Sequence, residues 1–134
     1  VSTGAEAQSQ AASDEMRLLL DTNVWLLYLQ GSSRIDERAR ARIDAADAIF
    51  VSAASVWEVA IKAQLGKLRA DAQQLLQISL ACGYAELPIV SEHALRAAAL
   101  PPLHSDPFDR LLVAQALTTP LRLLTTDSTL LGYS

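Results

Sequence analysis

A short apolar run that ends in an acidic residue constrains the fold of this chain more than any other stretch. Residues 18–20 are three consecutive leucines, which is typical of a strand buried on both faces of a sheet. Asp21 ends the run, and apolar residues then recur at helical spacing over 24–28. A carboxylate at that point would lie at the carboxyl edge of a parallel sheet, where open α/β folds place their functional sites. The alternative is that Asp21 only caps the following helix.

Further strand-like segments follow, and helical patterns separate them. The other predicted strands cover 48–51, 86–90 and 121–125, and Pro88 places the middle one of these at an edge or makes it irregular. The predicted helices begin just after Asp21 and then cover about 35–46, 56–65, 71–81, 91–100 and 106–118. Because strands that alternate with helices form a parallel sheet covered by helices, the sequence predicts a single α/β domain.

Several residues are expected to mark helix ends. Ser33, Ser91 and Asp106 are predicted N-caps, and Gly66 is a predicted C-cap. The stretch Ser55-Val56-Trp57-Glu58 matches a capping box, in which the Glu58 carboxylate would return to the start of the helix.

The length and composition limit the organisation of the chain. Its 134 residues are 51% hydrophobic, which fits one globular domain. We expect that domain to span residues 16–134 and residues 1–15 to be a flexible tail or extension, since the folded pattern begins at Met16. No segment approaches the ~18 consecutive apolar residues of a membrane span. A single cysteine agrees with a reducing compartment, so we expect a cytoplasmic protein.

The net charge argues against a surface that binds nucleic acid as a whole, and the few His and Cys residues argue against a zinc site. The formal net charge is −4, so any nucleic acid would have to be held locally and not by the whole surface. Cys82 is predicted to be a buried small hydrophobe. His93 is predicted on a helix surface and His104 in a loop, without the spacing of zinc ligands.

Four acids fall at predicted strand ends or first helical turns. They are Asp21, Glu58, Asp109 and Asp127. In a parallel sheet with helical crossovers the strand ends point to one edge, so these four side chains could converge although they are far apart in sequence. Each also has a structural explanation as a cap, a dipole partner or a turn residue.

Convergence of four carboxylates would require a cation, because the charges repel at short range. An oxygen-only ligand set suits Mg²⁺, for which Mn²⁺ can substitute. Such an ion activates water and stabilises charge on a phosphate, which would support phosphodiester hydrolysis. Thr22, Asn23 and Thr126 would orient carboxylates or water. Lys62 and Arg110 would be the nearest phosphate contacts, although plain surface charge explains them equally well.

The chain resembles the PIN domain, and more narrowly the VapC-type toxins of bacterial toxin–antitoxin pairs. The resemblance rests on Leu18-Leu19-Leu20-Asp21-Thr22-Asn23, on Ser52 to Lys62, on His104 to Ala116 and on Leu124-Thr125-Thr126-Asp127. It implies a three-layer α/β/α fold with a mainly parallel sheet of four strands, or of five as in relatives that continue past the Asp127 turn.

The same resemblance implies a function. It implies a Mg²⁺-dependent endoribonuclease that is a homodimer and is inhibited by a VapB-type antitoxin. By motif match, Asp21, Glu58 and Asp109 would be the core metal-binding acids and Asp127 the fourth, whereas Asp106 would be a cap only. Trp25 and Trp57 could contact the antitoxin, but aromatic residues are so often buried that we expect both in the core.

Two other functions remain open at this point. A phosphatase or phospho-receiver domain also uses an acid after its first strand and Mg²⁺, but phosphatases of that type have a second Asp two residues later, and Asn23 stands there. Receivers have paired acids near the first strand and a Lys after the last one. A catalytically silent binding module would be expected to have lost at least one of the four acids.

Overall fold

The computed structural model describes residues 16–102 and 105–127. The predicted tail, His104 and the region of a fifth strand lie outside the described residues. The described part contains four strands, β1 (Arg17–Leu20), β2 (Ala48–Ser52), β3 (Ala85–Leu87) and β4 (Arg122–Leu124). Its helices are α2 (Thr22–Leu29), α3 (Glu37–Ala45), α4 (Ala53–Gln64), α5 (Ala72–Ala81), α6 (Ser91–Ala99) and α7 (Pro107–Thr118).

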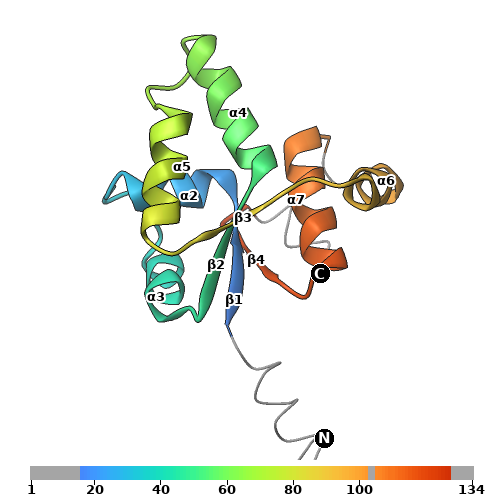
Figure 1. The fold of residues 1–134 in the computed structure, drawn as a ribbon, viewed down its shortest axis with the longest axis horizontal. Coiled ribbons are helices and arrows are strands. Elements are labelled where there is room, and N and C mark those ends of the chain that lie inside the picture. The colour runs from blue at the N-terminus through green and yellow to red at the C-terminus, as the bar shows by residue number, and fades with distance from the viewer. Residues whose placement is uncertain (1–15, 103–104, 128–134) are drawn as a thin grey trace, which may run out of the picture.

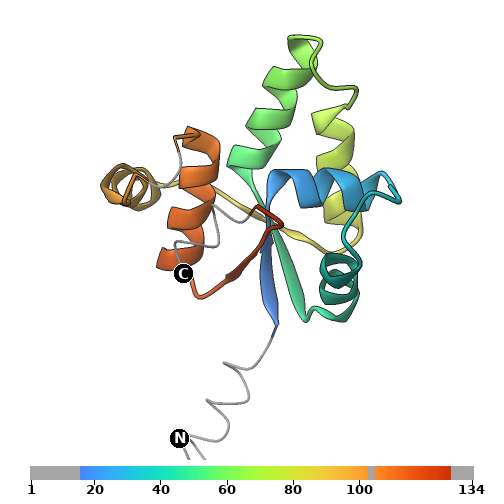
Figure 2. The ribbon, with the colours of Figure 1, turned by 180° about the vertical axis from the view of Figure 1, so that it is seen from behind.

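The strands form one parallel sheet in the order β3-β2-β1-β4. The first strand is therefore central, and the strand that carries the residues before Pro88 is at an edge, as predicted. Figure 1 shows the sheet between two groups of helices, with α2, α3 and α5 on one side and α6 and α7 on the other, and Figure 2 shows the same layers from behind. The α/β prediction is confirmed.

The central strand is buried on both faces because its three leucines alternate between two apolar clusters. Leu18 and Leu20 pack with residues of α2, α3, α4 and α5, among them Trp25. Leu19 packs on the opposite face against Leu112 of α7. All three are at most 1% exposed. This burial fixes the direction of β1 and places Asp21 at the carboxyl edge of the sheet.

The helix starts differ from the predictions at three places. α3 begins after Asp36, whose carboxylate accepts from the amides of Arg38 and Ala39, and not after Ser33. α4 begins after Ser52, whose hydroxyl accepts from the Ala54 amide at 3.0 Å. Ser91 lies inside the first turn of α6, after the N-cap Val90.

The earlier start of α4 rules out the predicted capping box. Ser55 is already within the helix and buried, and its hydroxyl accepts a hydrogen bond from Thr22 at 2.8 Å. Glu58 is consequently not at the third helical position. The predicted Gly66 C-cap is confirmed in substance, since Gly66 has φ +73° directly after the cap residue Leu65.

Three predictions of burial are wrong. Cys82 is exposed because it forms the C-cap at the end of α5. His93 is buried because its Nδ1 accepts from the Val90 amide, which holds the ring beneath the start of α6. Trp57 is 57% exposed, whereas Trp25 is fully buried as predicted. No helix in the described ranges is long and apolar enough to cross a membrane.

Candidate active site

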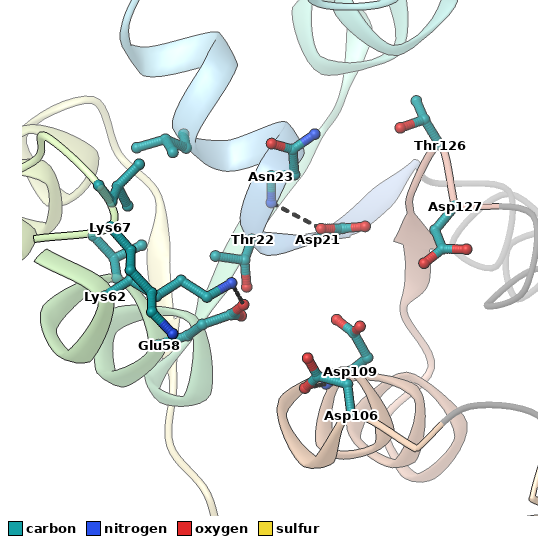
Figure 3. A pocket seen from close by; sticks show the side chains of 13 residues that line it. Asp21, Thr22, Asn23, Glu58, Lys62, Lys67, Asp106, Asp109, Thr126 and Asp127 are labelled. Carbon is teal, nitrogen blue, oxygen red and sulfur yellow. Dashed lines mark hydrogen bonds and ion pairs between the residues drawn. The ribbon is translucent and has the colours of Figure 1, made fainter. Parts of the chain in front are cut away.

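The carboxyl edge of the sheet opens into a cavity of about 430 Å³ that is lined mainly by charged and polar residues. The four predicted acids all line it, and Figure 3 shows their carboxylates around a common space. The polar and charged lining residues are Asp21, Thr22, Asn23, Glu58, Lys62, Lys67, Asp106, Asp109, Thr126 and Asp127. The expectation that distant acids meet at one edge of the sheet is therefore met in the structure.

Asp21 is held rigidly at the end of β1. The residue is only 7% exposed. Its carboxylate accepts hydrogen bonds from the Asn23 amide at 2.8 Å and from the Thr125 hydroxyl. Burial raises the pKa of the Asp21 carboxyl; these two hydrogen bonds oppose the rise, and the charges of Glu58 and Asp127 add to it. Asp21 is thus the N-cap of α2 and also a buried carboxyl group in the cavity, so the capping role and the position in the acid cluster are compatible.

Glu58 enters the cavity from α4 and is almost completely buried. Its Oε2 accepts from the Lys62 ammonium at 2.6 Å, one helical turn further on. Its Oε1 is buried and has no hydrogen-bond partner among the described residues. Lys62 is about half exposed, and the hydrogen bond to Glu58 raises its pKa, with further contributions from the charges of Asp106 and Asp109. A buried carboxylate oxygen without a partner is costly, and it marks a place where a ligand is expected.

The start of α7 contributes two acids to the cavity. Asp106 is the N-cap that was predicted, and its carboxylate accepts from the amides of Phe108 at 2.8 Å and Asp109 at 3.3 Å. Both Asp106 and Asp109 line the cavity, so Asp106 is a cap and a member of the acid cluster at once. Sequence reasoning had assigned it only the first role.

The segment after β4 supplies a residue that sequence reasoning missed. Thr125 donates its hydroxyl proton to Asp21 and accepts from the Asp127 amide at 3.0 Å. It therefore ties the first acid of the cluster to the last. Its neighbour Thr126, the predicted orienting residue, lines the cavity instead. The order of polar residues after a strand gave no signal to choose between the two threonines.

Of the remaining predicted site residues, Thr22, Asn23 and Lys62 lie at the cavity and Arg110 does not. Thr22 and Asn23 line the cavity, and so do both lysines of the chain, of which Lys67 was not predicted. Arg110 does not line it. The Arg110 guanidinium donates to the carbonyl oxygens of Ala97 at 2.8 Å and Leu100 at 3.0 Å, where it caps the end of α6.

The cavity suits a divalent cation in its donor chemistry. Five carboxyl groups and two ammonium groups line it, so negative charge is in excess. All the acidic donors are oxygens, which Mg²⁺ and Mn²⁺ prefer. Within the described ranges, no three His, Cys, Asp or Glu side chains are arranged to hold an ion as they stand. The unpartnered Glu58 oxygen and the buried Asp21 carboxylate nevertheless fit such an ion, because a cation would satisfy both.

The family follows from comparison with known proteins. The model of the PIN domain matches residues 18–132. The chain belongs to the PIN-domain family. No curated protein matches it significantly in sequence.

Three solved structures share the fold of this chain at low sequence identity. VapBC2 from Rickettsia felis bound to a promoter DNA fragment matches with a TM-score of 0.63 and 15% identity, over 88% of this chain and 93% of that one. FitAcB from Neisseria gonorrhoeae gives 0.59 and 22%, over 87% and 91%. A toxin–antitoxin complex from Klebsiella pneumoniae gives 0.59 and 19%, over 83% and 87%. At these sequence identities the comparison shows a shared fold and nothing beyond it.

Proposed function

We propose that this PIN domain is a Mg²⁺-dependent endoribonuclease and the toxin of a VapC-type toxin–antitoxin pair. One observation carries the proposal: buried carboxylates from β1 and α4 meet acids from α7 and the segment after β4 in one cavity, and one Glu58 oxygen there lacks a partner. Such an excess of buried negative charge destabilises a fold unless a cation is to be bound. Family membership supports the same conclusion.

The residues would divide the work as follows. Asp21, Glu58, Asp109 and Asp127 would hold the ion, with Mn²⁺ able to replace Mg²⁺. When bound, the ion would lower the pKa of a water molecule and neutralise charge on the phosphodiester. The Asn23 amide and the Thr125 hydroxyl fix both oxygens of the Asp21 carboxylate, which holds that ligand in one orientation.

The two lysines would bind the RNA backbone. Lys62 and Lys67 line the acid cavity, so their ammonium groups are placed to contact phosphate oxygens near the ion. In a chain with a net charge of −4 this local placement is needed, because the rest of the surface does not attract a polyanion. Arg110 is left out of this role, since its guanidinium is bonded to α6.

We also propose a protein partner and a second copy of the chain. The similar structures include toxin–antitoxin complexes, which supports an antitoxin partner. In this proposal the partner is a VapB-type antitoxin that covers the acidic cavity and neutralises the toxin, and the toxin itself is a homodimer. Co-expression with the gene product encoded next to this one, followed by light scattering, tests both. A chain that stays monomeric and binds no such product would contradict this part of the proposal.

The enzymatic proposal is tested with purified protein and a mixed RNA substrate. Cleavage is expected with Mg²⁺ or Mn²⁺, and excess EDTA should stop it. Asp109→Asn should abolish it without loss of the folded state measured by circular dichroism. Glu92→Gln is the matched control, because Glu92 is an exposed acid in the first turn of another helix, α6, outside the cavity. Cleavage that persists in EDTA would refute the metal mechanism. Metal binding without cleavage would favour the silent binding module.

A further inference from the structure

One aromatic side chain is exposed where burial would be expected. Trp57 is 57% exposed, and it is the one aromatic residue among the exposed large hydrophobic side chains of the described region. Its ring meets the Phe108 ring edge-on, with centroids 5.1 Å apart and an interplanar angle of 76°. Exposure of so large an apolar surface is unfavourable, whereas the edge-to-face contact holds the indole in place.

The two residues of the aromatic pair are neighbours in sequence of two acids that line the cavity, although neither ring lines it. Trp57 directly precedes Glu58 on α4, and Phe108 directly precedes Asp109 on α7. The pair thus bridges α4 and the first turn of α7, the two helices that supply these acids. The Asp106 carboxylate fixes the Phe108 amide at 2.8 Å, so the support beneath Trp57 is anchored to the cavity wall.

An exposed, braced aromatic ring next to a phosphate site is a feature of proteins that bind single-stranded nucleic acid. Unpaired bases stack on such rings, and the contact tolerates any base because each has a π face. The cavity supplies the complementary backbone contacts, since both lysines of the chain line it. A base-paired strand would not offer a free base face to the indole.

We propose that Trp57, braced by Phe108, is the platform on which an unpaired base of the RNA stacks next to the phosphate that is cleaved. The proposal rests on the endoribonuclease function and adds one residue to it: Trp57 would hold an unpaired nucleotide of any base at the stacked position. Trp57 is a specificity-determining residue in this view, and the acids alone carry the chemistry.

A protein partner is the competing occupant of this surface, and α4 offers a control that separates the two. Leu65 follows Trp57 by two helical turns on the same helix and is 62% exposed. A partner helix that covers this side of α4 would contact both residues. A base stacked on the Trp57 ring would not reach Leu65, because the C-cap of α4 lies two helical turns away.

Binding is measured without cleavage, by the fluorescence of the Asp21→Asn protein in EDTA with short RNA oligonucleotides. Trp25 is buried with its Nε1 bonded to Ser79 at 2.9 Å, so quenching reports on Trp57. Single-stranded RNA should quench the emission, and the same sequence as a duplex should not. In fluorescence anisotropy, Trp57→Ala should weaken single-strand binding about tenfold to a hundredfold. Trp57→Phe should retain most of the affinity, and Leu65→Ala should retain all of it.

The outcomes separate this inference from the function on which it rests. If the wild type cleaves RNA but Trp57→Ala binds and cleaves single strands normally, stacking is refuted and the endoribonuclease stands. If Leu65→Ala weakens RNA binding as much as Trp57→Ala, or if both weaken only antitoxin binding, the platform is refuted in favour of a general α4 interface. If the wild type cleaves no RNA with Mg²⁺, the endoribonuclease proposal itself fails.

Discussion

Two polar clusters each take a side chain from the segment of β2 and α4, Ser52 in one and Glu58 in the other, and the clusters differ in charge and in hydrogen bonding. One is the acid cavity, which contains an excess of carboxylates and a Glu58 oxygen without a partner. The other surrounds Gln115 of α7, whose side chain is completely buried. Both clusters connect segments that are far apart in sequence, but only the first is short of hydrogen-bond partners.

The Gln115 cluster contains no carboxylate, and none of its buried side-chain nitrogen and oxygen atoms lacks a hydrogen-bond partner in the described region. The Ser52 hydroxyl donates to Gln115 Oε1 at 2.5 Å, and Gln115 Nε2 donates to the Pro88 carbonyl at 3.2 Å. His93 Nδ1 accepts from the Val90 amide at 3.1 Å, which places the ring proton of the neutral imidazole on Nε2. These bonds join the end of β2, the segment after β3 and α7.

The difference between the clusters distinguishes a structural polar network from a functional one. A network that only joins elements pairs every buried donor with an acceptor, because each unpaired group is costly. The acid cavity instead holds like charges close together and raises the pKa of Asp21, at a cost to the metal-free fold. Mutations should therefore have opposite effects on stability in the two clusters.

The largest expected effect is on activity. Asp21→Asn should lower RNA cleavage at least about a hundredfold, because it removes a ligand charge where phosphate charge develops. The same change should raise the free energy of unfolding of the metal-free protein, measured by urea denaturation, since it removes a buried charge. A large loss of stability would show that Asp21 is mainly a structural cap.

The gain in stability from Asp21→Asn should depend on pH in a defined direction. Because the folded pKa of Asp21 is raised, the native state binds more protons than the unfolded state between the two pKa values, so this group destabilises the wild type as pH rises. The advantage of the variant should be full above the raised pKa of Asp21 and vanish below the usual pKa range of an aspartate. Urea midpoints measured across that range check the sign.

Gln115→Ala should act in the opposite sense on stability. The change leaves the Ser52 hydroxyl and the Pro88 carbonyl without their partner and opens a cavity, so it should cost about 2–4 kcal/mol of unfolding free energy. At saturating Mg²⁺ the protein that remains folded should still cleave RNA. Loss of activity in Gln115→Ala protein that is fully folded would show that the Gln115 cluster also contributes to function and is not purely structural.

Thr125→Val should have an intermediate effect confined to metal binding. Without the hydroxyl, the Asp21 carboxylate loses a hydrogen bond that lowers its pKa, and the Asp127 amide loses its acceptor. Mn²⁺ affinity measured by calorimetry should fall about tenfold to a hundredfold. Thr126→Val is the matched control, since that neighbour lines the cavity without a hydrogen bond to Asp21. Equal losses in both variants would deny Thr125 its orienting role.

The smallest effect is expected from Lys62→Met. The Lys62–Glu58 ion pair is half exposed on the lysine side, so its loss should cost about 1 kcal/mol in the metal-free protein. Added Mg²⁺ should offset that loss, because the ion supplies the missing positive charge beside Glu58. Thermal unfolding with and without Mg²⁺ measures the stability lost with the ion pair and the stability regained when Mg²⁺ binds. A deficit that Mg²⁺ leaves unchanged would show that Lys62 acts only through packing.

The fold class and the convergence of the four acids were predictable, whereas the details of bonding were not. The leucine run before Asp21, the Asp106 cap and the strand–helix alternation are local signals that act within a few residues. The start of α4, the burial of His93 and the exposure of Trp57 depend on contacts with other elements, so local propensity misjudged them.

By itself the sequence determined the alternation of strands and helices and the acid at the end of β1, because the alternation of apolar residues and the breaks between elements are short-range properties. The tertiary structure decided which polar groups meet. Thr125 bonds Asp21 across 104 residues of chain, and Ser52 bonds Gln115 across 63. Such pairings are set by strand order and helix packing, which no local pattern encodes, and they decide that one cluster pairs its buried polar groups while the other holds an excess of negative charge.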